Sequence, residues 1–349
     1  MSNEEIFLSG FLLFIAVILA LDLGLFNRKN VEVVSFKKAS LMSFFVVALS
    51  AGFYFFLVNY GNYLHGITDV EHLELLVKKH YHPIKIMPRD FEHSIALYNH
   101  NIGIEFFTGY IIEYALSVDN IFVILLIFTS FGVNKRHYHR VLFWGIIGAI
   151  MMRFIFIFIG AALIEKFSWI MYLFGLFLIY TAINMFIKKD ETDEISTDNH
   201  PVVKFANKYF RVHNSFVGNK FFVKIDGKRI ITPLFLVLII IEVSDLIFAV
   251  DSIPAIFSVT KDPYIVFFSN IFAIIGLRSM FFLLSGIVDK FRFLKVGLAV
   301  LLTFIGLKML LHTQLESIGF NNNHSLLIIV SILIISIITS LATPEKKNG

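Results

Sequence analysis

Long apolar segments recur along the chain, separated by shorter polar stretches. Most of them match or exceed the roughly 20 residues that a helix needs to cross the hydrocarbon core of a bilayer. The pattern predicts an all-α polytopic membrane protein with about nine transmembrane helices. The expected spans are residues 6–26, 39–60, 102–131, 141–164, 169–187, 230–258, 264–288, 294–312 and 324–342.

Composition supports this class of protein. Hydrophobic residues make up 57% of the chain and charged residues 16%, with a mean hydropathy of +0.78. Soluble domains are closer to about 45–50% apolar and about 25% charged. The chain has no cysteine, which excludes disulfide scaffolds, iron–sulfur clusters and thiolate metal sites.

The basic residues predict the orientation in the membrane. If the N-terminus lies outside, 21 of the 30 lysines and arginines fall on the inner side and six on the outer side. The positive-inside rule then predicts a protein of the cell inner (plasma) membrane, with its N-terminus outside and its C-terminus in the cytoplasm. Because topology accounts for the net charge of +4, we expect no nucleic-acid partner.

An internal repeat is visible in three pairs of matching motifs, which keep the same order along the chain. Three matches in one order argue against chance similarity of apolar segments. Each copy holds three spans, and an odd number forces the copies into opposite orientations. Two inverted three-helix repeats (spans 3–5 and 6–8) are typical of secondary transporters with a site at the midplane. The pairs are 113–121 with 245–253, 146–148 with 274–276, and 175–183 with 297–305.

The predicted organisation along the chain follows from the spans and the repeat. Two N-terminal helices are expected to precede a histidine-rich outward loop, and a polar, basic cytoplasmic loop to separate the two repeats. The expected boundaries are 1–60 for the first two helices, 61–101 for the outward loop, 102–187 for repeat 1, 188–229 for the cytoplasmic loop, 230–312 for repeat 2, and 313–349 for the last span and tail.

Acidic side chains inside the apolar spans are the main candidates for function. Each costs roughly 2.5–3.5 kcal/mol at the bilayer centre, so protons, cations or fixed partners must offset five of them. Arg153 and Arg278 offer an alternative as structural ion pairs, but two arginines cannot neutralise five carboxylates. The candidate metal ligands are Glu113, Asp119, Asn120, Glu242, Asp245, Asp251 and Ser252, and the candidate supporting or gating residues are Asp22, Asn270, Arg278 and Pro254.

The ligand types indicate a hard cation. Carboxylates, hydroxyls and an amide suit Mn²⁺, Ca²⁺ or Mg²⁺, and no histidine or cysteine accompanies this set of residues. Glu242 and Asp251 lie nine residues apart, on opposite faces of a regular helix. They can share one site only if the helix is interrupted, and we expect Pro254 to kink or break it.

Two further segments leave alternatives open. Six of the twelve histidines lie in the outward loop, where residues 69–80 have a helical pattern. This segment is either a solvated amphipathic helix on the membrane surface or a lid that collects metal or senses pH. The apolar stretch 272–284 either faces lipid or forms a subunit interface, so the oligomeric state stays open.

These motifs resemble the TerC/Alx family of integral membrane proteins. The resemblance rests on residues 109–120 (GYIIEYALSVDN), 242–256 (EVSDLIFAVDSIPAI), 269–278 (SNIFAIIGLR) and 21–23 (LDL). It implies a transporter of divalent metal, chiefly an exporter of manganese, and the family was first named for tellurite resistance. The family's acids correspond to Glu113, Asp119, Glu242, Asp245 and Asp251. The outward loop is longer than we expect in this family.

Taken with the residues, the resemblance predicts a secondary transporter that exports Mn²⁺ from the cytoplasm. The chain has no GxxxxGK[ST] motif for ATP, so we expect coupling to protons and no resident cofactor. An intramembrane aspartyl hydrolase would need one close pair of acids, and five acids exceed that need, so we expect no enzyme. The alternative function is a membrane scaffold or metallation partner without transport activity. The expected partners are the metal ion, protons and the lipid bilayer.

Overall fold

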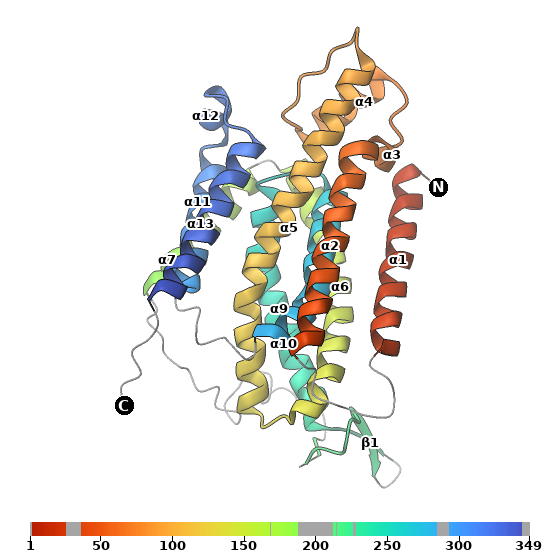
Figure 1. Cartoon of the computed structure of the whole chain (residues 1–349), viewed down its shortest axis with the longest axis vertical. Coiled ribbons are helices and arrows are strands. Elements are labelled where there is room, and N and C mark those ends of the chain that lie inside the picture. The colour runs from red at the N-terminus through yellow and green to blue at the C-terminus, as the bar shows by residue number, and fades with distance from the viewer. Residues whose placement is uncertain are drawn as a thin grey trace.

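The computed structural model describes residues 2–25, 36–167, 169–187, 212–213, 215–225, 228–284 and 293–343. Long helices run side by side along one axis, and short helices cover one end (Figure 1). The elements are α1 (Asn3–Leu25), α2 (Phe36–Tyr60), α3 (Asn62–His65), α4 (Val70–His80), α5 (Phe91–Ser130), α6 (Lys135–Lys166), α7 (Ile170–Ile187), β1 (Phe222–Ile225), β2 (Lys228–Ile231), α9 (Pro233–Phe257), α10 (Pro263–Leu284), α11 (Leu294–Leu310), α12 (His312–Ser317) and α13 (Asn322–Ala342).

The predicted class is confirmed. Six of the described helices are long and apolar enough to cross a membrane, namely α1, α2, α6, α9, α10 and α13, and two shorter apolar helices lie within α7 and α11. The protein is therefore an all-α polytopic membrane protein. The count of nine spans and the inverted repeat stay predictions.

The helices of the two predicted repeats pack against one another. Both α5 and α6 contact α9 and α10, and α7 packs on α11. The α7–α11 contact is close because both backbones carry glycine there. A Cβ built on Gly306 would lie 2.8 Å from the carbonyl oxygen of Gly175. Larger residues at this crossing would push the two helices apart.

Helix α10 lies at the centre of the bundle, where α5, α2 and α6 pack around it. Phe272 is 2% exposed and Phe281 is fully buried. Both alternatives for this stretch, a lipid-facing surface and a subunit interface, are wrong for these two residues. Other helices of the same chain cover them.

The helix α5 is longer than its apolar segment. It has 40 residues and begins at Phe91, where the side chain of Asp90 accepts a hydrogen bond from the backbone N–H of His93. The predicted span began only at residue 102. The difference arises because a good N-cap starts the helix in polar sequence, before the apolar stretch that identifies a span.

Residues 69–80 form a helix, as the pattern predicted. Asp69 caps α4 by accepting a hydrogen bond from the N–H of His72, and Leu73 and Leu76 are buried in the main core. Helix α4 therefore packs onto the end of the bundle through its apolar face. Its last residue, His80, is also buried.

A short β-hairpin precedes α9, and the sequence analysis did not anticipate it. Strands β1 and β2 pair antiparallel, with Phe222 opposite Ile231. Thr232 joins the hairpin to the helix by donating its backbone N–H to the carbonyl of Phe221. The helix then begins at Pro233, which has no N–H to satisfy. Residues 188–211, most of the predicted cytoplasmic loop, lie outside the described residues.

Pro254 does not break α9. The helix continues through it to Phe257, and Pro254 lies within its last turns. A proline removes one backbone hydrogen bond, and a helix that ends shortly afterwards tolerates this loss. The interruption that we expected there is therefore wrong.

Candidate functional site

A single arginine organises the polar groups inside the bundle. Arg153 lies in the middle of α6 and is fully buried. Its Nη1 donates to Glu113 on α5, to Asn270 on α10 and, at 3.3 Å, to the hydroxyl of Ser252 on α9. Its Nη2 lies 3.3 Å from Oδ1 of Asp245, also on α9. We call these five residues the Arg153 cluster.

The guanidinium suits this position because its N–H donors point in fixed, divergent directions. Further hydrogen bonds orient the side chains that bind Arg153. The amide of Asn270 donates to the carbonyl of Val266 at 3.1 Å, which leaves its oxygen facing Arg153. The hydroxyl of Ser117, one turn along α5, lies 3.4 Å from the same Glu113 oxygen that Arg153 binds. Four helices are thus tied together at one point.

The cluster carries more negative than positive charge. One guanidinium faces two carboxylates, and the second oxygen of each, Oε2 of Glu113 and Oδ2 of Asp245, is buried without a hydrogen-bond partner among the described residues. A buried acceptor without a partner is costly unless a proton, water or cation occupies it. The arrangement is suited to binding a cation.

A third carboxylate lies nearby on α9. Glu242 is one turn before Asp245 and rests directly on the backbone of α6 at Gly148, where an added Cβ would lie 2.2 Å from its Oε1. Only glycine leaves room for the carboxylate in this position. Gly148, the last residue of the repeated motif 146–148, therefore lets the Glu242 side chain pack directly against the backbone of α6.

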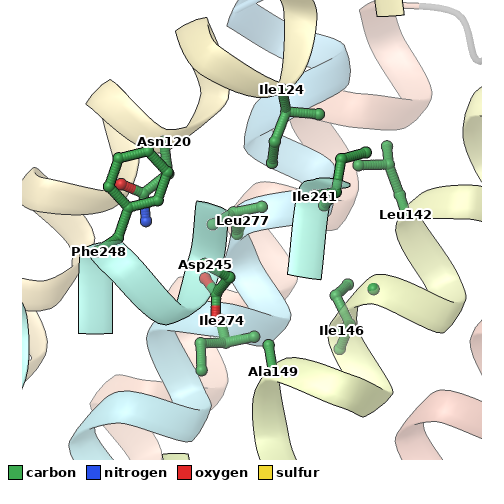
Figure 2. Close-up of a pocket in the computed structure, with 11 residues that line it drawn as sticks. Asn120, Ile124, Leu142, Ile146, Ala149, Ile241, Asp245, Phe248, Ile274 and Leu277 are labelled. Atoms are coloured by element: carbon green, nitrogen blue, oxygen red, sulfur yellow. The ribbon is translucent and has the colours of Figure 1, made fainter. Parts of the chain in front are cut away.

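A small pocket borders the cluster at Asp245. Figure 2 shows Asp245 within it, between α9, α6 and α10. Among the described residues that line it, Asn120 and Asp245 are polar and the others are apolar. Its lining on α6, Leu142 to Ala149, precedes Arg153, so the pocket lies on the hairpin side of the arginine.

Aromatic side chains pack between the helices on the opposite side of the cluster. Phe106 on α5, Phe257 on α9 and Phe268 on α10 are buried, and each lies nearer to the α3–α4 end than the cluster residue on its own helix. Phe106 and Phe268 both pack against Phe53. The pocket beside Asp245 and this aromatic packing therefore lie on opposite sides of the cluster.

The structure brings together four of the candidate residues: Glu113, Asp245, Ser252 and Asn270. Asn120 lines the pocket beside Asp245. Arg278 is buried two turns beyond Asn270 and lines a different, largely apolar pocket with residues of α1 and α2. The side chains of Asp22, Asp119 and Asp251 lie outside the described residues.

The central position of Arg153 is what sequence reasoning missed. The ion pairs that it makes with Glu113 and Asp245 match the structural alternative stated for the arginines. A signal was present, since a lone arginine in a long apolar segment needs buried partners. The sequence alone did not identify them, because they lie 40 and 92 residues away.

Fold and cluster together define a polytopic integral membrane protein with a buried, acid-rich centre. A model of the integral membrane protein TerC family matches residues 98–348, and the chain belongs to this family. It is 42% identical to "Putative membrane-bound redox modulator Alx" of Photorhabdus laumondii over 86% of this chain and 85% of that protein. It is 40% identical to the protein of the same name in Escherichia coli K12, over 86% and 84%.

A relative with a less specific name covers more of the chain. "Uncharacterized membrane protein STKORF319" of Myxococcus xanthus is 40% identical over 95% of this chain and 91% of its own length. No solved structure matches. The resemblance to the TerC/Alx family that the motifs indicated is therefore confirmed.

Proposed function

We propose that the protein is a secondary transporter that exports Mn²⁺, with the Arg153 cluster as its cation-binding centre and protons as the coupling ion. The observation that carries this proposal is the pair of buried carboxylates, Glu113 and Asp245, which share one guanidinium and each keep an oxygen without a partner among the described residues.

The donor set supports a hard divalent cation. The Arg153 cluster contains carboxylate, hydroxyl and amide oxygens, and oxygen ligands suit Mn²⁺, Mg²⁺ and Ca²⁺. Asn120 lines the pocket beside Asp245, Glu242 lies one turn before Asp245 on α9, and both would add oxygens. Selectivity among the three ions would depend on the number of ligands and the space between them.

Arg153 would act as an internal substitute for the transported cation. In the absence of metal it offsets part of the acidic charge, which lowers the free-energy cost of burying the carboxylates in the membrane. A divalent ion that binds the same carboxylates would repel the guanidinium and release it from them. Binding and release of the metal ion would thereby switch the contacts among α5, α6, α9 and α10 between two arrangements.

The position of the pocket supports alternating access. It borders Asp245 on the side nearer the hairpin end, which the positive-inside rule assigns to the cytoplasm, while buried phenylalanines pack toward the opposite end. This conformation would load metal from the cytoplasm. Export against a negative interior costs about 4.6 kcal/mol per 100 mV for two charges, so protons moving inward are the expected driving force.

The word "redox" in the names of relatives does not point to thiol chemistry here. The chain contains no cysteine, so its own side chains cannot form or exchange disulfides. Any redox effect of this protein would act through a metal ion or another molecule. Metal transport is the simpler activity for the residues present.

Reconstitution of the purified protein in liposomes tests the proposal. We expect saturable Mn²⁺ movement, competition by Ca²⁺ or Mg²⁺ according to selectivity, and dependence on an imposed pH gradient. The absence of flux of all three ions from well-folded protein would exclude a transporter. It would favour the alternative, a scaffold or metallation partner.

A further inference from the structure

A second group of buried titratable side chains lies away from the Arg153 cluster. His65 ends α3, His80 ends α4, and Asp262 precedes α10, and all three are buried. Each offers one ligand atom, and these atoms all lie within 4.8 Å of one another. Figure 1 places α3 and α4 at the end of the bundle beside the start of α1. We call these three residues the loop-end cluster.

His65 is fixed by carboxylates on both sides. Its Nε2 lies 2.8 Å from Oδ2 of Asp262, and its Nδ1 lies 2.7 Å from Oε1 of Glu4 on α1. The other oxygen of Asp262 accepts the backbone N–H of Tyr264 at 2.9 Å, so the carboxylate cannot turn away. The hydroxyl of Tyr264 binds the other oxygen of Glu4 at 3.1 Å. Ring and carboxylate are thus held in place before any ligand arrives.

His80 is the residue that hydrogen bonding does not explain. It is 6% exposed, its ring lies 5.7 Å from that of His65, and its Nε2 is buried without a hydrogen-bond partner among the described residues. Burial lowers the pKa of His80, so the neutral imidazole has a lone pair to offer. In the neighbouring His82, Glu105 holds Nδ1 at 3.0 Å, while Nε2 is likewise buried with no hydrogen-bond partner in the described part of the chain.

We propose that His65, His80 and Asp262 form a binding site for a divalent transition-metal ion, separate from the Arg153 cluster. Two imidazole nitrogens and one carboxylate oxygen, completed by water, are a common donor set for Zn²⁺ and for Fe²⁺. The ion would replace the hydrogen between His65 Nε2 and Asp262. Glu4 would remain on Nδ1, in the carboxylate–histidine–metal arrangement that orients metal-binding histidines.

The location gives the metal ion a structural role, which depends neither on transport nor on the proposed substrate. Asp262 joins α9 to α10, and Asn270 of the Arg153 cluster lies eight residues further, about 12 Å along the helix axis. A metal ion here would fasten α3 and α4 to the connection between these two helices. His65 and His80 also precede residue 98, where the match to the family model begins.

Zn²⁺ binding to the full-length protein in detergent tests the site. After removal of metal with a chelator, Zn²⁺ is titrated into wild type, His80→Gln and the control His93→Gln, whose ring is exposed on α5. Loss of a residue that only orients a metal ligand lowers metal affinity by about 10–100-fold, so loss of a direct ligand should lower it at least tenfold. We expect that loss in His80→Gln and no more than a twofold change in His93→Gln.

Zinc X-ray absorption separates this site from the oxygen ligands in the membrane, because imidazole rings give a characteristic multiple-scattering pattern. We expect this pattern in wild type and in Asp245→Asn. Its absence from wild type, or equal Zn²⁺ affinity in His80→Gln and His93→Gln, would overturn the proposal. Should His80→Gln fail to fold, Asp262→Asn replaces it, since an amide keeps the hydrogen bond from the N–H of Tyr264.

Discussion

The Arg153 cluster and the loop-end cluster offset buried acidic charge in different ways. In the first, an arginine binds two carboxylates, and each keeps one oxygen that has no partner within the described part of the chain. In the second, a histidine lies between two carboxylates, and burial, which lowers its pKa, is outweighed by Asp262 and Glu4, which raise it to about 9. A guanidinium stays charged at all accessible pH values, whereas an imidazole can give up its proton to a metal. One site is suited to a hard ion in transit and the other to a retained transition metal.

Among changes to the Arg153 cluster, removal of the arginine should have the largest effect on stability. Arg153→Met leaves Glu113 and Asp245 buried without their partner, and breaking a buried pair in this way costs about 3–5 kcal/mol. We expect a strong loss of thermal stability in detergent, partly restored by Mn²⁺ because the ion replaces the missing charge.

The control for this variant is Lys166→Met, which removes an exposed cation from the end of the same helix. It should leave stability almost unchanged, with or without Mn²⁺. Equal stability of Arg153→Met and wild type would show that the carboxylates do not depend on the arginine.

Loss of one carboxylate should weaken Mn²⁺ binding by about 100-fold, because affinity for hard cations depends on the number of charged ligands. Glu113→Gln keeps the size of the side chain and removes its charge. Titration of Mn²⁺ in the full-length protein measures the effect, and Glu165→Gln, an exposed acid of α6, serves as the matched control. Unchanged affinity in Glu113→Gln would remove this residue from the site.

In the loop-end cluster, Glu4→Gln should lower Zn²⁺ affinity about tenfold. Glu4 touches His65 Nδ1 and would orient the metal ligand without binding the ion itself. Glu5→Gln, at an exposed position one residue further, should bind Zn²⁺ like wild type. Mn²⁺ binding at the Arg153 cluster should not change in either variant, and a parallel loss there would show that the two clusters are not separate.

The smallest expected effect concerns space near Glu242. Gly148→Ala would place a Cβ 2.2 Å from Oε1, so the carboxylate must move, and we expect Mn²⁺ transport to fall a few-fold without loss of the fold. Gly52→Ala on α2 is the control, since nothing lies within 4 Å of its added Cβ. That control should be stabilised by about 0.5–1 kcal/mol, as is usual for this change in a helix. Equal flux in the two variants would show that the position of Glu242 is unimportant.

The sequence predicted what depends on local pattern. Apolar length identified the membrane class, and the 69–80 periodicity predicted α4, which Asp69 caps in the structure. The buried position of α10 was not predictable, because a helix that is apolar on every face looks the same whether lipid or protein covers it. Packing with the rest of the chain decides this.

The two clusters show the same limit. The buried acids were apparent as costly residues in apolar segments, yet their shared partner Arg153 depends on contacts up to 117 residues apart. His65 and Asp262 are 197 residues apart, and no motif links them. The histidine-rich loop was noticeable from composition, but only the fold reveals that His65 and His80 face Asp262.

The most direct test of the central claim is Mn²⁺ flux into or out of liposomes that contain Asp245→Asn, compared with wild type and Glu165→Gln at equal amounts of folded protein. If the Arg153 cluster is the cation-binding centre of a transporter, flux should disappear in Asp245→Asn and stay at the wild-type level in Glu165→Gln. Flux through Asp245→Asn at the wild-type rate would contradict this assignment and place the path of the ion elsewhere in the bundle.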